Sequence, residues 1–147
     1  MRPKSIVNFE RVVLLGILVG IVNTWLSWGK MLAMAQAQAA SQGSAMKIGP
    51  GFLIGTQVVG IAIFLLLLWL IARKGSPIAK WIYVVLAVIG LIFAVIGLGK
   101  AAALGTVPLV LSIVAHLLTL ASLWFLFQPD AKAWFSEGRS VDPNDLR

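Results

Sequence analysis

The sequence contains no cysteine, a single histidine and only five acidic residues, and charged residues make up 12% of its 147 positions. Without cysteine, a fold held together by disulfides is excluded. One histidine and no cysteine leave too few ligands for a zinc or haem site, so we expect no metal and no cofactor. Soluble domains carry about 25% charged residues, and hydrophobic residues make up 60% of this chain. An ordinary soluble domain and a disordered protein are therefore both excluded.

Four stretches without Lys, Arg, Asp or Glu are long enough for a helix to cross a bilayer core of about 30 Å. They are residues 12–29, 48–72, 81–99 and 101–128. Allowing for helix ends, we predict membrane spans at about residues 11–33, 50–72, 78–99 and 104–128. The long runs are continuously apolar, whereas strands of a membrane barrel alternate and are about 9–11 residues long. A cleaved signal peptide is the rival interpretation of the first stretch, but that apolar block is long for a signal.

The predicted fold is an all-α integral membrane protein, a four-helix up-down-up-down bundle, because short connections make neighbouring helices antiparallel. Residues 1–129 form the membrane domain and residues 130–147 a cytoplasmic helix and polar tail. In this short C-terminal helix, Ala131, Trp134 and Phe135 share one face. We expect that face to lie on the cytoplasmic leaflet as an interfacial helix.

Turn-forming residues mark the predicted helix ends. Pro50, Pro77 and Pro108 stand near the starts of spans two, three and four, where a missing backbone N–H is tolerated. Ser76 and Thr106 are predicted N-caps. Residues 34–47 are rich in Ala and Gln, which favours an outward continuation of the first helix, with a flexible loop as the alternative.

The basic residues divide unequally between the two ends of the predicted spans. Three lie opposite the chain termini, namely Lys30, Lys47 and Lys100. The other nine lie on the side of the termini: Arg2, Lys4, Arg11, Arg73, Lys74, Lys80, Lys132, Arg139 and Arg147. The positive-inside rule therefore places both termini in the cytoplasm. Aromatic residues at the predicted span ends are expected to anchor the interfaces: Trp25, Trp28, Trp69, Trp81, Tyr83 and Trp124.

Small residues recur at helical spacing on three of the spans. Such rows let helix backbones approach closely in a membrane. We predict helix packing through Gly16, Gly20, Gly51, Gly55, Ala87, Gly90, Ala94 and Gly97. The sequence leaves open whether they meet helices of the same chain or of another, so a homo-oligomer and a different membrane-protein partner are both expected partners, besides the lipid bilayer.

A few polar residues lie within the spans. The candidate intramembrane site consists of Asn23, Gln57, Ser112, His116 and Thr119. His116 is the only titratable residue deep in a span, and such residues are functional candidates. It would act as a proton acceptor or substrate contact oriented by Asn23 or Ser112. The other interpretation is that it stays neutral and bonds a neighbouring helix.

No arrangement of residues indicates catalysis. The spans contain no Asp or Glu, which removes carboxylate and metal-dependent chemistry. Phosphate-binding loops are absent, and the basic charge reflects membrane topology, so no nucleic acid is implied. We expect a non-enzymatic structural or accessory subunit that acts through helix packing. The alternative is a small oligomeric channel or transporter lined by the polar residues.

Three segments resemble a group of small uncharacterised bacterial inner-membrane proteins with four helices and no assigned activity. They are the opening Arg2-Pro3-Lys4-Ser5-Ile6-x-x-Phe9-Glu10, the step Asn23-Thr24-x-Leu26-Ser27-Trp28, and the closing Phe127-x-Pro129-x-Ala131-x-Ala133-Trp134-Phe135. The resemblance covers nearly the whole chain. It implies the fold and the bacterial cytoplasmic (inner) membrane as location, and it transfers no functional residues.

Overall fold

A computed structural model describes residues 2–41 and 49–137, and these form five α-helices. They are α1 (Lys4–Ser41), α2 (Pro50–Lys74), α3 (Pro77–Leu104), α4 (Thr106–Leu126) and α5 (Pro129–Glu137). The first four are long and apolar enough to cross a membrane. Residues 42–48 and the tail from residue 138 lie outside the described residues, so the interpretation of residues 34–47 is tested only as far as Ser41, where the chain is helical.

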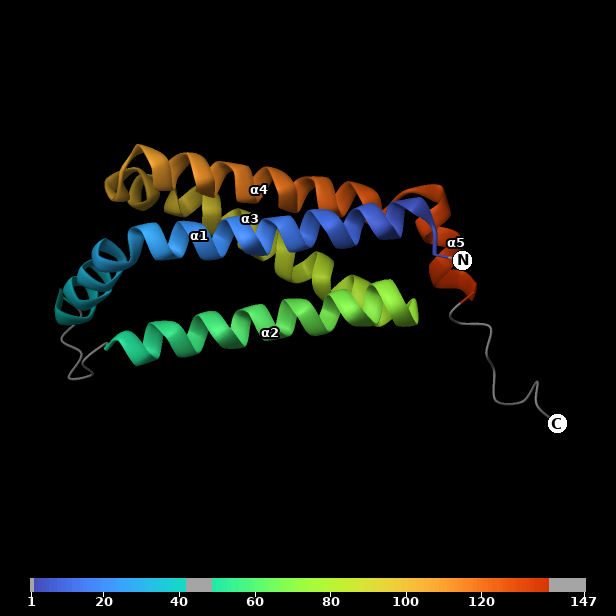
Figure 1. Cartoon of the computed structure of the whole chain (residues 1–147), viewed down its shortest axis with the longest axis horizontal. Coiled ribbons are helices and arrows are strands. Elements are labelled where there is room, and N and C mark those ends of the chain that lie inside the picture. Colours follow the sequence, from blue (N-terminus) through green and yellow to red (C-terminus); the bar gives the residue numbers. More distant parts are fainter. Residues whose placement is uncertain (1, 42–48, 138–147) are drawn as a thin grey trace.

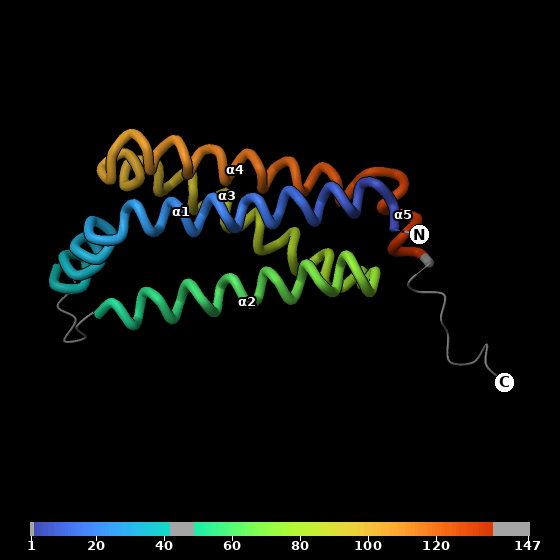
Figure 2. The backbone as a smooth tube through the Cα atoms, viewed as in Figure 1, coloured from blue at the N-terminus to red at the C-terminus, as the bar shows by residue number. Residues whose placement is uncertain are grey.

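Consecutive long helices run in roughly opposite directions, and α3 crosses obliquely from the end of α2 to the start of α4 (Figure 1). α1 lies against α4 over most of its length and makes its most extensive packing there. The backbone trace in Figure 2 shows that α2 lies apart from α1 along much of its course and that the last part of α1 bends away from its first part. The start of α1 and the short α5 lie at the same end of the molecule.

The helix ends follow from local sequence. Pro77 opens α3, and Ser76 caps it by accepting a hydrogen bond from the backbone N–H of Ala79 at 3.3 Å. The predicted N-cap at Thr106 is displaced by one residue, because Thr106 is the first residue of α4 and Gly105 takes the cap position with a φ of 121°. This φ lies in a region that residues with a Cβ rarely adopt, whereas glycine populates it readily.

Gly75 ends α2 in the left-handed conformation, with a φ of 60°. A Cβ at this position would lie 3.2 Å from the backbone oxygen of Trp134 on α5. Two features therefore favour glycine at position 75, namely the left-handed turn and the close approach of α5. The turn between α2 and α3 therefore packs directly against α5.

The buried core lies at one end of the molecule. It combines the start of α1, the end of α2, the start of α3, the end of α4 and one face of α5. Its apolar members are Ile6, Phe9, Val13, Leu67, Leu68, Ile71, Ala72, Ala79, Tyr83, Ala87, Leu126, Ala131 and Phe135. Towards the opposite end, the four long helices expose large apolar side chains along their lengths.

α5 closes this end of the bundle. Ala131 and Phe135 are buried, and the indole Nε1–H of Trp134 donates to the carbonyl of Ile71 at 3.1 Å. Asp130 accepts hydrogen bonds from the hydroxyl of Ser5 at 2.6 Å and from its backbone N–H at 3.1 Å. These bonds hold the pKa of Asp130 below its usual value.

The apolar face of α5 contacts a different partner from the one that the sequence predicts. The sequence predicts that Ala131, Trp134 and Phe135 rest on the lipid leaflet. Instead this face packs on the ends of the other helices. The physical reason is that the bundle end offers an open carbonyl at the end of α2 for the indole N–H in addition to apolar surface, whereas lipid chains offer apolar surface only.

Candidate functional site

Three of the predicted site residues form a polar row along α4. His116 Nδ1 lies 2.5 Å from the backbone carbonyl of Ser112, one helical turn earlier. Because a carbonyl only accepts, Nδ1 is the donor in this bond. Thr119 Oγ1 donates to the carbonyl of Ala115 at 3.0 Å. Ser112, His116 and Thr119 are all half-buried.

The polar row is thus bonded to its own helix. The hydroxyl of Ser112 is not the partner of the His116 ring, so the structure shows no nucleophile–base pair between them. The packing interpretation predicts a bond from His116 to a neighbouring helix. The bond that Nδ1 makes stays within α4 instead. Satisfying polar side chains with the carbonyl four residues earlier is a common solution for helices in apolar surroundings.

Asn23 lies on α1, and its side-chain oxygen is buried without a hydrogen-bond partner among the described residues. Ser27, one turn further along, is 2% exposed, and its hydroxyl oxygen is also without a partner in the described part of the chain. Asn23 therefore does not orient His116 in this structure. The two atoms mark a face of α1 that is polar and buried, where each unsatisfied group is destabilising.

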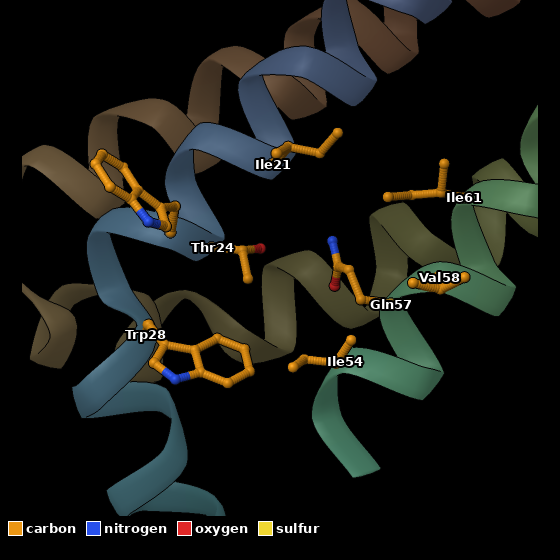
Figure 3. A pocket seen from close by; sticks show the side chains of 8 residues that line it. Ile21, Thr24, Trp28, Ile54, Gln57, Val58 and Ile61 are labelled. Carbon is orange, nitrogen blue, oxygen red and sulfur yellow. The ribbon is translucent and has the colours of Figure 1, made fainter. Parts of the chain in front are cut away.

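Gln57 lies in a different place, in a cleft between α1 and α2. The cleft has a volume of about 510 Å³. Its apolar walls come from Ile21, Trp25 and Trp28 on α1 and from Ile54, Val58 and Ile61 on α2. Thr24 and Gln57 are its polar lining residues, and Figure 3 shows them facing each other from the two helices.

Some of the predicted helix-packing residues contact another helix of the same chain, and others face outward. A Cβ on Gly16 would lie 3.8 Å from the Cβ of Leu118, so α1 and α4 approach closely there. Ala87 is buried and Ala94 is half-buried. At the other predicted glycines, a Cβ would have no atom of the described chain within 4 Å outside the local helix: Gly20, Gly51, Gly55, Gly90 and Gly97.

The predicted interfacial position of Tyr83 is wrong. Its side chain is 2% exposed, and its hydroxyl lies 2.6 Å from Ser122 Oγ. A signal is present in the sequence, because Ala79, Tyr83 and Ala87 recur every fourth residue and all three are buried. Small residues flanking an aromatic ring on one helix face leave room for that ring in a core.

The sequence predicts only one role for Lys80, as one of the basic residues that set the membrane orientation. In the structure it is 8% exposed, and its ammonium lies 4.7 Å from the ring centre of Phe127 and 4.8 Å from that of Phe135. Two aromatic faces stabilise the cation where water is scarce. Lys80 therefore helps to hold the end of α4 and α5 against α3.

No protein-family model, curated protein or solved structure shows significant similarity to this chain.

Proposed function

We propose that this protein is a multi-pass integral membrane protein without catalytic activity, which serves as a structural or accessory subunit by packing its helices against another membrane protein or a second copy. In this proposal the four long helices form an up-down-up-down bundle in the bacterial cytoplasmic membrane, with both termini in the cytoplasm. α5 then lies at the cytoplasmic end.

The observation that carries the proposal is the apolar outer surface of the long helices. In the most apolar stretch of each helix, no more than 22% of the residues are buried inside the chain. Large apolar side chains are exposed on all four, for example Leu18, Val59, Ile96 and Leu117. A surface of this kind in water would drive aggregation, whereas lipid chains cover it at no cost.

The free glycine rows support lateral association. Gly51 and Gly55 on α2 and Gly90 on α3 have space where a side chain would be, and they are exposed. Association of helices in lipid depends on close packing at small residues. These positions are therefore available to a helix of another chain.

The channel alternative is ranked second because its polar residues are separated. Gln57 lies in the α1–α2 cleft, while Ser112, His116 and Thr119 follow α4, where His116 Nδ1 and Thr119 Oγ1 bond to carbonyls of their own helix. Four helices of one chain are too few to enclose a pore, so conduction would require a ring of copies around a common axis. Flux through vesicles that contain the purified protein tests this alternative.

The proposal is tested by the number of copies in lipid nanodiscs, measured by native mass spectrometry. We expect two or more copies, or one copy with a bound membrane-protein partner when the disc is formed directly from cell membranes. Gly90→Leu should weaken this association at least about tenfold, because leucine prevents close helix approach. Single-chain stability should be unchanged, since the site is open within the chain.

The matched control is Ile89→Leu, which changes a neighbouring exposed residue and conserves its volume. It should leave association unchanged. A monomer without a partner, or an unchanged assembly of Gly90→Leu, would contradict the packing proposal.

A further inference from the structure

The cleft between α1 and α2 has two polar side chains that the chain itself does not satisfy. Thr24 and Gln57 face each other in Figure 3, and neither makes a hydrogen bond to another described residue. The rest of the lining is apolar. If the long helices lie in lipid, an unpaired amide in this position is costly. An occupant that supplies a hydrogen-bond partner would remove that cost.

The size of the cleft limits what the occupant can be. An apolar cavity of about 150 Å³ holds a benzene molecule, so about 510 Å³ holds a considerably longer apolar chain. A helix with side chains is about 10–12 Å across and fills roughly 1,000 Å³ in two turns. The volume therefore favours a single hydrocarbon chain over a partner helix.

The depth of the cleft indicates which part of a lipid reaches the polar pair. Trp25 and Trp28 line the same cleft, and tryptophan prefers the level of the lipid headgroups. Thr24 lies one turn deeper than Trp28, about 6 Å along the helix axis. The ester carbonyls of glycerolipids lie just inside the headgroups, so the polar pair and the carbonyls share one level.

We propose that the α1–α2 cleft binds one acyl chain of a membrane glycerolipid, with an ester carbonyl accepting a hydrogen bond from the Gln57 amide or the Thr24 hydroxyl. The chain then lies along the apolar walls formed by Ile21, Val58 and Ile61. This inference rests on the membrane placement proposed above and goes beyond it, because it assigns a ligand class to one cleft.

The test uses the full-length protein in nanodiscs made of a diether phosphatidylcholine, which has no ester carbonyl. A trace of diacyl phosphatidylcholine with a photoactivatable diazirine on its acyl chain is added, and adducts are mapped by mass spectrometry. We expect labelling to concentrate on the cleft side of α1 and α2. Unlabelled diacyl lipid should compete about fivefold better than unlabelled diether lipid, the difference that one hydrogen bond makes.

Two variant pairs separate the cleft from the rest of the surface. Val58→Trp fills the cleft and should reduce labelling there at least about fivefold, because the indole takes the space of the acyl chain. Val59→Trp is its matched control, since Val58 is 59% exposed and Val59 58% exposed on another face of α2. Gln57→Leu combined with Thr24→Val should remove the preference for diacyl over diether lipid, whereas Thr56→Val, outside the cleft, should keep it.

The outcomes distinguish this inference from the membrane proposal. Uniform labelling of all exposed helix faces, or equal competition by the two lipids in the unmodified protein, would overturn the lipid site and leave the membrane placement intact. Absence of adducts on every helix would overturn both.

Discussion

Tyr83 illustrates how a single polar atom is accommodated in the core. Its ring meets the rings of Phe9 and Phe64 edge-on, with centroids 5.2 and 5.8 Å apart. Its hydroxyl lies 2.6 Å from Ser122 Oγ, which itself donates to the carbonyl of Thr119 at 2.7 Å. The Ser122 proton is therefore used, and Tyr83 is the donor in their bond. The phenol thus links α1, α2, α3 and α4 through one side chain.

Substitution of Tyr83 separates the hydrogen bond from the ring packing. Tyr83→Phe keeps both ring contacts and should lower the free energy of unfolding by about 1 kcal/mol, the net value of one hydrogen bond. Tyr83→Ala should lower it by about 3–5 kcal/mol, because a buried aromatic ring is lost. Denaturation of the purified protein in mixed micelles with increasing SDS measures both.

Phe93→Ala is the control for the loss of an aromatic side chain, because Phe93 is 67% exposed on the same helix. It should change stability by less than about 1 kcal/mol. If Tyr83→Ala were no more destabilising than Phe93→Ala, the core position of Tyr83 would be wrong.

The pairing of α1 with α4 is the main helix–helix contact of the molecule. Near the middle of α4, Gly16 brings the backbone of α1 close to Leu118. Further along α1, Lys30 Nζ donates at 2.7 Å to the carbonyl of Leu104, which is the last residue of α3 and directly precedes the turn into α4. The glycine permits close approach of α1 and α4, while the lysine satisfies a carbonyl at the end of α3 and so ties α1 to the segment that leads into α4.

Two glycines on α1 provide a matched test of this contact. Gly16→Leu should lower the free energy of unfolding by about 1–3 kcal/mol, because the larger side chain overpacks the interface with α4. Gly16→Ala should be tolerated, since its Cβ would lie at an ordinary contact distance of 3.8 Å. The same micelle denaturation experiment measures both.

Gly20→Leu is the control on the next turn of α1, where a Cβ would have no described atom within 4 Å outside the local helix. It should have little effect on single-chain stability. Equal destabilisation by Gly16→Leu and Gly20→Leu would show that the loss comes from the helix itself and not from α4.

The whole molecule is tightly packed at one end and open towards the other. The buried core and α5 lie where α1 begins and α2 ends. The cleft beside Gln57 lies towards the opposite end, where the last part of α1 bends away. Most of the basic residues that the structure describes lie towards this packed end, for example Lys4 at the start of α1, Arg73 at the end of α2 and Lys132 on α5. Under the proposed topology this packed end faces the cytoplasm.

The orientation is tested with single cysteines, since the chain has none of its own. Ser136→Cys on α5 and Ser41→Cys at the end of α1 place exposed thiols at the two ends. A membrane-impermeant maleimide should label Ser41→Cys in spheroplasts and Ser136→Cys in inverted membrane vesicles. Labelling of both from the same side would contradict the four-span topology.

The number and the apolar character of the long helices follow from the order of residues along the chain, whereas α1 extends beyond its predicted span at both ends. The apolar runs predict four long helices, and Pro50, Pro77 and Ser76 mark where two of them begin. These features are local, because a helix satisfies its backbone bonds within its own segment. The proposed membrane insertion and orientation also follow from local sequence, and they await the labelling experiment.

The arrangement of the helices was decided by tertiary structure. Side chains that face lipid and side chains that face the core are both apolar, so the hydrophobic pattern does not say which face is buried. For this reason the sequence misplaces Tyr83 and the apolar face of α5, and it groups the polar residues of three helices into one site. Only the packing of α1 on α4, with α2 set apart, separates the cleft at Gln57 from the row at His116.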